Sequence, residues 1–444
     1  MRRRTVERPR RSLRSTIATV GLLAVAMVGQ AACSNGGTPG PGPSEGSAAA
    51  SGGVGELTMW VRAANEGKSR ELAAAYEEAT GIRVAVTAFP DDQYVTRLAT
   101  AASTGDLPDV LATDSAYMPR FLEPNIFADL TDRVAALPFA DELFEPLMDV
   151  STRDGRVYAL PRDPGNSMVL WNKDLFREAG IDPDAAPTTW AEMLESARAV
   201  DALGGDVSGF YFPGNCGVCN VFPWLPLVWA SGGDLFDAEG RPTFDDPEVV
   251  AALELYRTIV QEGLVPPSAQ TDTGSDWMTA FTAGKVGILP LGSFGIGTIR
   301  EANPEMDMGI APLPGREGGS ASFVGGDVIG IPLASAHPDE AWEFIAWTLS
   351  DEVQIDVVAA SHELVARTDL VENEHSEADP LVRIANDALA VSRTPQSVFY
   401  QQLVVDANGP FSTLFYDVTY GGADPAEAAA AAQRAALDVV GAGE

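Results

Sequence analysis

Apolar and polar residues follow two periods in the first part of the chain. Five consecutive segments alternate between strand and helix patterns: 56–63, 67–82, 82–89, 91–106 and 107–113. In the first helical segment Leu72 and Tyr76 share one face, and Gly81 is a typical helix stop. Because two parallel strands need a crossover connection between them, this order predicts a parallel sheet covered by helices.

The same alternation returns further along the chain. Four more segments show the helical spacing of apolar residues: 188–200, 247–263, 339–351 and 424–440. The first of them opens with Thr189 and Glu192, three residues apart, which is the pattern of a capping box. The sequence has no repeat of fixed period, so we expect an α/β protein rather than a repeat array.

The first 55 residues differ from the rest in composition. A strongly basic start precedes an apolar run, Val20–Val28, which is too short to span a bilayer and is typical of an export signal. The run ends at Gln30-Ala31-Ala32-Cys33, which resembles the lipobox of bacterial lipoproteins, where the cysteine is diacylated. Residues 1–33 are thus predicted to be a lipoprotein signal peptide with a lipidated Cys33. Residues 34–55, rich in Gly, Pro, Ser and Ala, are predicted to be a disordered tether to the outer face of the cell membrane.

Charge excludes several classes of partner. The chain has 29 basic and 63 acidic residues and a net charge of −34, so it would repel a nucleic acid backbone. Its only lysines are Lys68, Lys173 and Lys285, which leaves no polybasic patch. The body after the tether, about 390 residues, is long enough for two cores.

Catalytic motifs are scarce. The three histidines, His337, His362 and His375, are dispersed, and the sequence has neither a G-x-S-x-G elbow nor a Walker A loop. We therefore expect no enzymatic activity, no metal and no cofactor. A secreted glycosidase, which needs two opposed carboxylates, is the enzymatic alternative.

Several sequence blocks resemble one family in the same order. The most specific are WNKDLFREAG at 171–180 and PTTWAE at 187–192; others are GGDLFD at 232–237, AFTAGKVGIL at 280–289 and FVGGDVIGIPLAS at 323–335. Together they resemble the family 1 extracellular solute-binding proteins, the sugar receptors of ABC importers, which include maltose-binding protein.

The resemblance implies a two-lobed, periplasmic-binding-protein-like fold (type II), with a ligand cleft and a hinge. Carried onto this sequence, it implies a first lobe of 56–163 plus 313–350 and a second lobe of 164–312 plus 351–444. It also implies a monomeric receptor that delivers a small sugar to ABC permease subunits in the membrane.

Candidate ligand contacts follow from the predicted strands. In an open α/β sheet, ligands bind beyond the carboxyl ends of the strands. The candidates just after strands are Arg62, Asn65, Asp114 and Tyr117, and those at the first presumed crossover are Asp163 and Asn166. Gly325, Gly326 and Asp327, which directly precede VIGIPLAS, are further candidates. Each has a structural alternative: Asp114, for example, can cap the following turn, and Gly325 and Gly326 can serve the backbone alone.

A sugar offers hydroxyl groups and apolar C–H faces, so its site also needs flat aromatic rings. The resemblance implies that Phe222 and Trp224 supply such rings, and that Phe294 stands where the family carries a stacking tryptophan. Trp229 is expected in the core, while for Trp277 cleft and core are both open.

The motif Cys216-Gly-Val-Cys219 is consistent with a redox centre, half a zinc site or a staple. Outside the cytoplasm cysteines pair, and with Cys33 acylated only these two remain. No further cysteine or nearby histidine completes a zinc site. Flanking glycines and a proline favour a loop over the helix start of a thiol oxidoreductase. We therefore predict a disulfide that stiffens a loop presenting Phe222 and Trp224.

The nature of the ligand is less constrained. The candidate site has no basic cluster, which argues against a phosphorylated ligand or a carboxylate. A neutral mono- or oligosaccharide is the first expectation. A cationic solute such as a polyamine is the alternative, held by Asp114, Asp163 and Asp327 with nearby aromatics.

Overall fold

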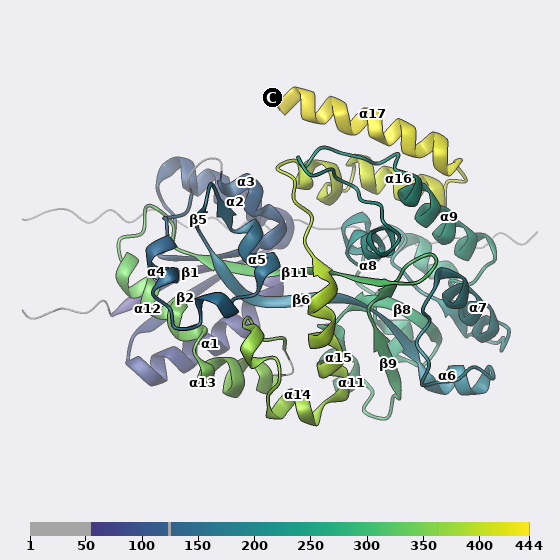
Figure 1. The fold of residues 1–444 in the computed structure, drawn as a ribbon, viewed down its shortest axis with the longest axis horizontal. Coiled ribbons are helices and arrows are strands. Elements are labelled where there is room, and N and C mark those ends of the chain that lie inside the picture. The colour runs from purple at the N-terminus through teal and green to yellow at the C-terminus, as the bar shows by residue number, and fades with distance from the viewer. Residues whose placement is uncertain (1–54, 123–125, 362, 444) are drawn as a thin grey trace, which may run out of the picture. The chain divides into compact units, whose positions relative to one another are not determined.

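The structure is a computed structural model that describes residues 55–122, 126–361 and 363–443 (Figure 1). The predicted signal peptide, its Cys33 and the tether up to residue 54 lie outside the described residues and stay predictions. In the described part of the chain, no helix combines the length and apolar character needed to cross a membrane.

The N-terminal part of the described chain alternates strands and helices in the predicted order. Its elements are β1 (Glu56–Arg62), α1 (Glu66–Thr80), β2 (Arg83–Phe89), α2 (Asp91–Thr104) and β3 (Val110–Asp114). β1 pairs in parallel with both β2 and β3. α1 and α2 each end at a glycine in the left-handed conformation, Gly81 and Gly105. The crossover arrangement predicted for this part is therefore confirmed.

The described residues form one large sheet with the strand order β2-β1-β3-β11-β6-β8-β7. The strands beyond the first three are β6 (Leu160–Asn172), β7 (Ser208–Phe210), β8 (Val286–Gly292), β9 (Met308–Ala311), β10 (Leu313–Pro314), β11 (Ser320–Gly330) and β12 (Ser392–Arg393). β11 runs antiparallel to both β3 and β6. The sheet is therefore mixed: the parallel order predicted for residues 56–113 is confirmed for β1, β2 and β3, and antiparallel pairs join them to the other strands.

β6 and β11 join two sets of strands. The first half of β6, up to Asn166, pairs with β11. Its second half, from Ser167, pairs with β8, and β7 adds to β8 in parallel. The single uninterrupted strand β6 thus belongs to two sets of strands. The first set contains β1, β2, β3 and β11, and the second contains β7, β8 and β9.

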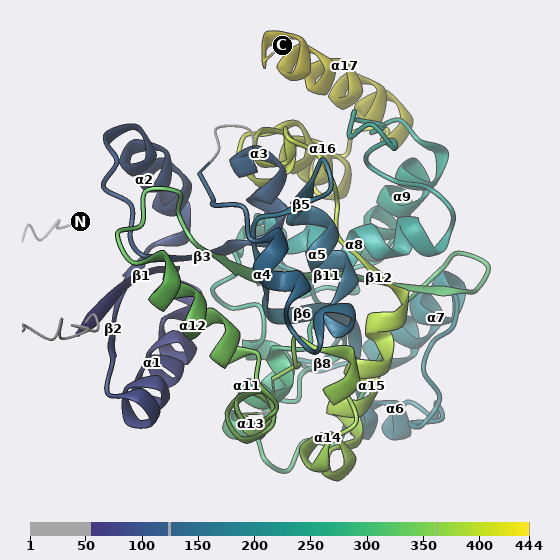
Figure 2. The same ribbon diagram turned by 60° about the vertical axis from the view of Figure 1, so that its left-hand side comes forward.

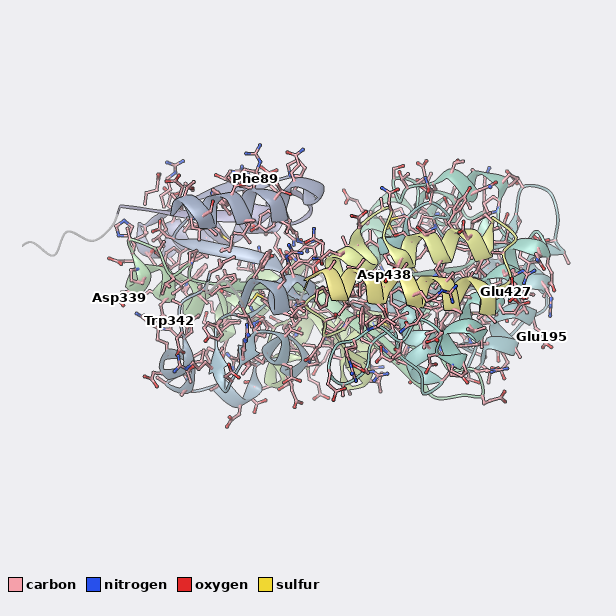
Figure 3. All side chains as sticks on the ribbon, turned by 90° about the horizontal axis from the view of Figure 1, so that it is seen from above. Phe89, Glu195, Asp339, Trp342, Glu427 and Asp438 are labelled. Atoms are coloured by element: carbon pink, nitrogen blue, oxygen red, sulfur yellow. A yellow bond between two sulfur atoms is a disulfide. The ribbon has the colours of Figure 1, made fainter. Side chains whose placement is uncertain are left out.

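Helices cover the two sets separately (Figures 1 and 2). The principal ones are α7 (Trp190–Asp201), α8 (Gly217–Ala230), α9 (Pro247–Gln261), α12 (Pro338–Thr348), α16 (Pro410–Thr419) and α17 (Pro425–Gly443). A smaller core joins β1 and β3 to α1 and α12 through Leu57, Val110 and Phe344. A larger core includes the apolar faces of α7, α8, α9 and α16. α16 packs along α17, which carries Glu427 and Asp438 on its surface (Figure 3).

Shorter elements complete the fold. They are α3 (Met118–Leu122), α4 (Thr131–Ala135), α5 (Glu145–Val150), β4 (Thr152–Arg153), β5 (Arg156–Val157), α6 (Lys173–Glu178), α10 (Thr279–Thr282), α11 (Gly295–Ala302), α13 (Asp351–Val353), α14 (Glu374–Ala378) and α15 (Pro380–Ala388). Two further turns matter for the site: the 3-10 helix η2 (Ser115–Tyr117) and the π-helix η9 (Gln401–Val405).

The capping box predicted for α7 forms only in part. Thr189 Oγ1 accepts a hydrogen bond from the Glu192 amide at 3.2 Å, as expected for an N-cap. The Glu192 carboxylate accepts instead from the amide and hydroxyl of Thr188, one residue before the cap.

The segment after α12 differs from the expected division into lobes. Ala366, placed in the second lobe by the resemblance, lies in the smaller core with Leu57 and accepts a hydrogen bond from the Phe144 amide. The next residue, Arg367, stacks over the ring of Phe139 at 4.0 Å. Residues 366 and 367 therefore pack with the first set of strands, and the other boundaries stay a proposal.

Candidate ligand-binding site

A charged network lies at the carboxyl ends of β1 and β3. Arg62, the last residue of β1, donates from Nε to Oδ1 of Asp327 at 3.0 Å, and its Nη1 lies 3.2 Å from Oδ2 of Asp114. Asn65 donates from Nδ2 to the other oxygen of Asp327 at 2.7 Å. Asp327 is fully buried, whereas the side chains of Arg62 and Asp114 are 15% and 25% exposed. Arg62 and Asp114 thus form the accessible edge of a network anchored on Asp327.

Asp114 also caps the turn that follows it. Its Oδ1 accepts a hydrogen bond from the Ala116 amide at 3.0 Å, at the start of η2. Capping was the structural alternative for this residue, and the carboxylate makes both interactions at once. Since one oxygen caps the turn and the other meets Arg62, the carboxylate is held in one orientation.

Tyr400 approaches this network from the C-terminal part of the chain. Burial raises the pKa of its phenol, and the nearby Asp114 carboxylate and Tyr117 raise it further. Tyr400 was not among the residues predicted from the sequence, where its one signal is the aromatic pair of Phe399 and Tyr400 directly before η9.

Phe222 and Phe294 form an aromatic surface that packs on β11. Their ring centroids lie 6.4 Å apart, and Phe294 is 47% exposed. Phe222 also packs against the buried Phe323 at 5.1 Å. At Gly325 a Cβ atom would lie 3.3 Å from the Phe222 ring, so this glycine lets the ring pack on β11. Because Asp327 follows two residues later on the same strand, β11 connects the aromatic surface with the charged network.

The neighbouring glycine serves the backbone. Gly326 has a φ of +112°, and a Cβ there would lie 2.0 Å from the carbonyl oxygen of Asp163. Only glycine adopts this conformation at such a close approach without strain. As the structural alternative predicted, the backbone conformation alone explains the glycine at position 326.

Trp224 does not face the site. Its side chain is 0% exposed, and its ring centroid lies 5.4 Å from that of Phe411. The expectation that it contacts a ligand is therefore wrong: the helical period of α8 turns Trp224 into the larger core while Phe222 stays accessible. Trp229 is buried, as expected.

Asp163 and Asn166 on β6 are also withdrawn from solvent. Asn166 is fully buried and donates from Nδ2 to the Ala385 carbonyl at 2.7 Å. Asp163 accepts a hydrogen bond from the Asp327 amide at 2.8 Å, and its other oxygen lies 3.0 Å from Nη1 of Arg162. Burial raises the pKa of Asp163, although Arg162 and Lys68 oppose the shift. These two residues hold β6 to its neighbours rather than line a ligand surface.

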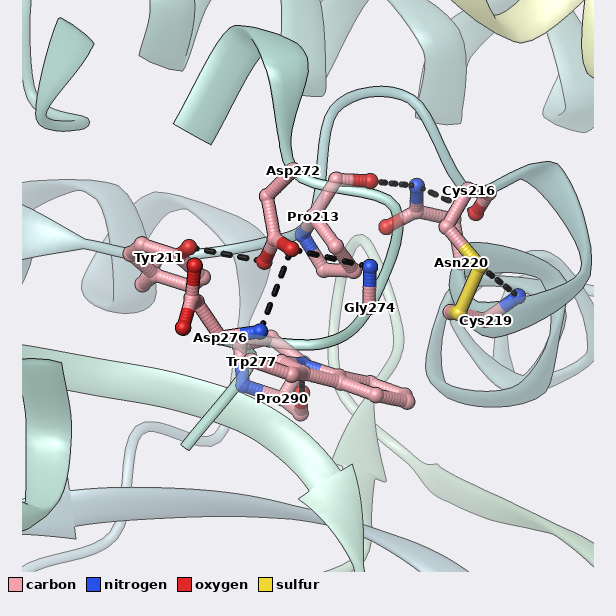
Figure 4. The surroundings of a disulfide bond; sticks show 10 residues. All are labelled: Tyr211, Pro213, Cys216, Cys219, Asn220, Asp272, Gly274, Asp276, Trp277 and Pro290. Carbon is pink, nitrogen blue, oxygen red and sulfur yellow. Dashed lines mark hydrogen bonds between the residues drawn. A yellow bond between two sulfur atoms is a disulfide. The ribbon is translucent and has the colours of Figure 1, made fainter. Parts of the chain in front are cut away.

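The cysteine pair forms the predicted disulfide, with Cα atoms 5.3 Å apart (Figure 4). Its setting differs from the prediction, because Cys216 is the N-cap of α8 and Cys219 lies in the first turn. The expected loop is therefore wrong: the helix begins directly at the pair and continues through two prolines. Asn220 ties this turn to the preceding segment by donating to the carbonyls of Pro213 and Cys216.

The disulfide packs against the segment that carries Trp277. A Cβ at Gly274 would lie 2.7 Å from Sγ of Cys219, so the backbone passes directly over the sulfur. Asp272 fixes this segment by accepting from the amides of Gly274 and Asp276 (Figure 4). Trp277 itself is half-buried and donates from Nε1 to the Pro290 carbonyl at 3.2 Å.

The accessible candidates are therefore Arg62, Asn65, Asp114, Tyr117, Phe222, Trp277 and Phe294. They combine hydrogen-bond donors and acceptors with exposed ring faces, which suits a ligand that has both polar groups and apolar faces. Within the described ranges, no group of three or more His, Cys, Asp or Glu side chains is placed to hold a metal ion.

Curated proteins with similar sequences are binding proteins. The chain is 28% identical over 277 residues to a putative binding protein of Brucella abortus, covering 62% of this chain and 66% of the relative. It is 28% identical over 353 residues to the diacetylchitobiose-binding protein DasA of Streptomyces coelicolor, covering 77% and 79%. The match thus spans just under two thirds of the length of the first relative.

Solved structures share the fold. A solute-binding protein of an ABC transporter from Thermotoga lettingae, bound to α-D-tagatose, superimposes with a TM-score of 0.76 at 24% identity. The match covers 86% of this chain and 99% of that chain, which confirms the predicted two-lobed α/β fold. The family model "Bacterial extracellular solute-binding protein" matches residues 63–355, more than half of the sequence. The chain therefore belongs to the bacterial extracellular solute-binding proteins.

Proposed function

We propose that this protein is a receptor that binds a neutral carbohydrate outside the cytoplasm and delivers it to the permease subunits of an ABC importer. The observation that carries the proposal is that β11 connects the aromatic pair of Phe222 and the exposed Phe294 with the charged network of Arg62 and Asp327. A ring face covers the C–H face of a sugar, and the charged edge meets its hydroxyl groups.

The charge pattern supports a neutral ligand over a cation. Arg62 lies between the carboxylates of Asp114 and Asp327 and interacts with both. A polyamine would therefore meet carboxylates whose charge the guanidinium already offsets in part, and it would also meet the guanidinium itself. Asp163, the third acid of the cationic alternative, is buried against Arg162.

The relatives support a carbohydrate ligand. One is named for diacetylchitobiose, and the structural neighbour holds tagatose. Both ligands are neutral and rich in hydroxyl groups, although one is a disaccharide and the other a monosaccharide.

The family works outside the cytoplasm, and the N-terminal sequence supports an anchor there. We propose that Cys33 carries a diacyl group that holds the protein at the outer face of the cell membrane. We propose further that the protein acts as a monomer, without enzymatic activity or cofactor, and that its lobes comprise largely the ranges implied by the resemblance.

A thermal-shift screen with neutral mono- and oligosaccharides tests the receptor function. A ligand at 100 times its dissociation constant stabilises the folded state by about 2.7 kcal/mol, so a clear rise in melting temperature is expected. Spermidine in the same screen tests the cationic alternative. A shift with spermidine and none with any sugar would overturn the proposal. Product analysis of the same mixtures tests the glycosidase alternative, which predicts cleavage.

A further inference from the structure

An exposed valine adjoins the aromatic surface. Val218, in the first turn of α8, is 41% exposed, although most apolar side chains of this helix are buried. It precedes Phe222 by four residues, so the two side chains share one face of the helix and their Cβ atoms lie about 6 Å apart. Phe222 in turn meets Phe294, which is 47% exposed. Val218, Phe222 and Phe294 therefore form a row of neighbouring apolar side chains, which we call the apolar strip.

The strip continues along β11 towards the charged network. α8 packs on β11, and Trp229 lies beside Phe323, with ring centroids 5.6 Å apart. Phe222, two turns earlier on the helix, also reaches Gly325, two residues further along the strand. The helix and the strand thus run in opposite directions, and Val218 lies on the side of Phe222 that faces the charged end of β11. A ligand that rests on the aromatic surface meets Val218 at this edge.

The backbone that carries Val218 is held from two sides. The disulfide joins Cys216 and Cys219, so Gly217 and Val218 lie inside a small covalent ring. The inner side of this turn packs against α16, because a Cβ atom at Gly217 would collide with the side chain of Ser412. The turn thus presents Val218 to solvent in one position, and a ligand that packs on it has little backbone to order.

A valine side chain favours a small apolar group over a ring face. The C–H face of a sugar ring is broad and is covered by flat aromatic rings, which Phe222 and Phe294 supply. A branched aliphatic side chain has no flat face and covers a compact group such as a methyl. It also forms no hydrogen bond, so a hydroxyl group placed against it loses water without gaining a partner. Burial of a methyl group at the same place raises the affinity about fourfold.

We propose that Val218 is a specificity-determining residue of the ligand site, and that the receptor prefers a sugar with a methyl-bearing substituent over the same sugar with a hydroxyl group there. An acetamido group and a 6-deoxy carbon both present such a methyl group, and they differ in the atoms that connect it to the ring. This inference rests on the proposed carbohydrate function and specifies the class of sugar.

Titration calorimetry with matched pairs of sugars tests the inference. The acetamido pairs are glucose with N-acetylglucosamine and cellobiose with N,N′-diacetylchitobiose. The deoxy pair is galactose with 6-deoxygalactose. In a pair that binds, the wild-type affinity is expected to be about fourfold higher for the methyl-bearing sugar, and the pair that shows this preference identifies the substituent. Val218→Ser is expected to remove the preference by weakening the methyl-bearing sugar alone.

Two variants serve as controls. Val218→Ile keeps a branched aliphatic side chain and is expected to retain the preference. Leu437→Ser removes an apolar side chain that is 48% exposed on α17, and it is expected to leave both affinities unchanged. Val218→Thr, which has nearly the shape of valine but carries a hydroxyl group, is the second test variant if Val218→Ser fails to fold.

The outcomes separate this inference from the receptor function. A preference that survives in Val218→Ser and Val218→Thr would overturn the inference, because the methyl group would then contact another residue. Equal wild-type affinity within every pair, or binding confined to sugars without a methyl group, would also overturn it and leave the receptor function standing. Absence of binding to every sugar of the thermal-shift screen would overturn the receptor function, and the inference with it.

Discussion

Arg62 on β1 donates to Asp327 on β11, a carboxylate with no exposed surface. The pair joins strands whose residues lie far apart in the sequence and holds the accessible edge of the site. Removal of the carboxylate charge would leave a mostly buried guanidinium with Asp114 as its remaining carboxylate partner. Asp327→Asn is therefore expected to lower the free energy of unfolding by about 3 kcal/mol, measured by urea denaturation.

The matched control is Asp339→Asn. Asp339 pairs with Arg133 at the surface, where its side chain is 81% exposed. Exposed pairs contribute about 0–1 kcal/mol, so this variant is expected to stay close to wild type. If Asp327→Asn and Asp339→Asn lowered the free energy of unfolding equally, Asp327 would not be a buried anchor of the network.

Phe294→Ala tests the aromatic surface. Because the ring is half exposed, its removal is expected to leave the melting temperature nearly unchanged. Loss of stacking on a sugar ring is worth about 1 kcal/mol, so the dissociation constant measured by calorimetry is expected to rise about fivefold. Leu333→Ala, at another exposed apolar side chain, is the control and is expected to keep the wild-type affinity. A drop in melting temperature with unchanged affinity would assign Phe294 to the core.

Replacement of both Cys216 and Cys219 by serine tests the disulfide. The ring it closes is short, so little entropy is removed from the unfolded chain and a small loss of melting temperature is expected. The affinity is expected to fall by a larger factor, because the first turn of α8 and the backbone at Gly274 lose their common brace. Wild-type protein treated with a dithiol reductant is expected to show the same fall in affinity and the same small loss of melting temperature. A large loss of stability with intact binding would refute a local role.

A pH-dependent contribution to stability is expected from Asp379, the N-cap of α15. Burial alone would raise its pKa, but the hydrogen bond and charge of Arg300 outweigh burial and lower it below 3.8. The folded state then binds the proton less tightly than the unfolded chain. The stabilisation is therefore fully present above pH 3.8 and is lost as the pH falls through the lowered value.

Asp379→Asn removes this titration while asparagine can still cap the helix. The variant is expected to be less stable than wild type at pH 7, and the difference in unfolding free energy should narrow below pH 3.8. Urea denaturation at several pH values measures the difference. If the difference in unfolding free energy between wild type and Asp379→Asn grew as the pH fell, the pKa of Asp379 would not be lowered in the folded state.

Local patterns predicted local structure well. The strands and helices from Glu56 to Asp114 follow the alternation of apolar and polar residues. The disulfide followed from compartment and cysteine count. Arg62, Asn65 and Asp114 were found because parallel strands end at the same edge of a sheet.

Other features depend on contacts distant in sequence. Trp224 and Phe222 stand two residues apart, and the helix that begins at Cys216 turns them to different sides. Because a loop was predicted here, the sequence could not indicate that one ring is buried and the other accessible. Asn166 was predicted to stand at the first crossover between the lobes. In the structure it lies within β6, where it donates to the Ala385 carbonyl, and no local pattern indicates that partner. Tyr400 likewise lies near Asp114 although some 290 residues of chain separate them, and no local pattern indicates this contact.

The uninterrupted strand β6 fixes the phase of two side-chain patterns at once. Successive residues on a strand point to opposite faces, so an odd insertion inverts every side chain beyond it. An added residue at Gly165 would keep Asp163 against β11 but shift Trp171 out of step with β8 and β9. Because the two pairing regions of β6 meet directly at Asn166 and Ser167, no residue between them can absorb an insertion, and library designs that vary loop length in this protein should leave β6 untouched.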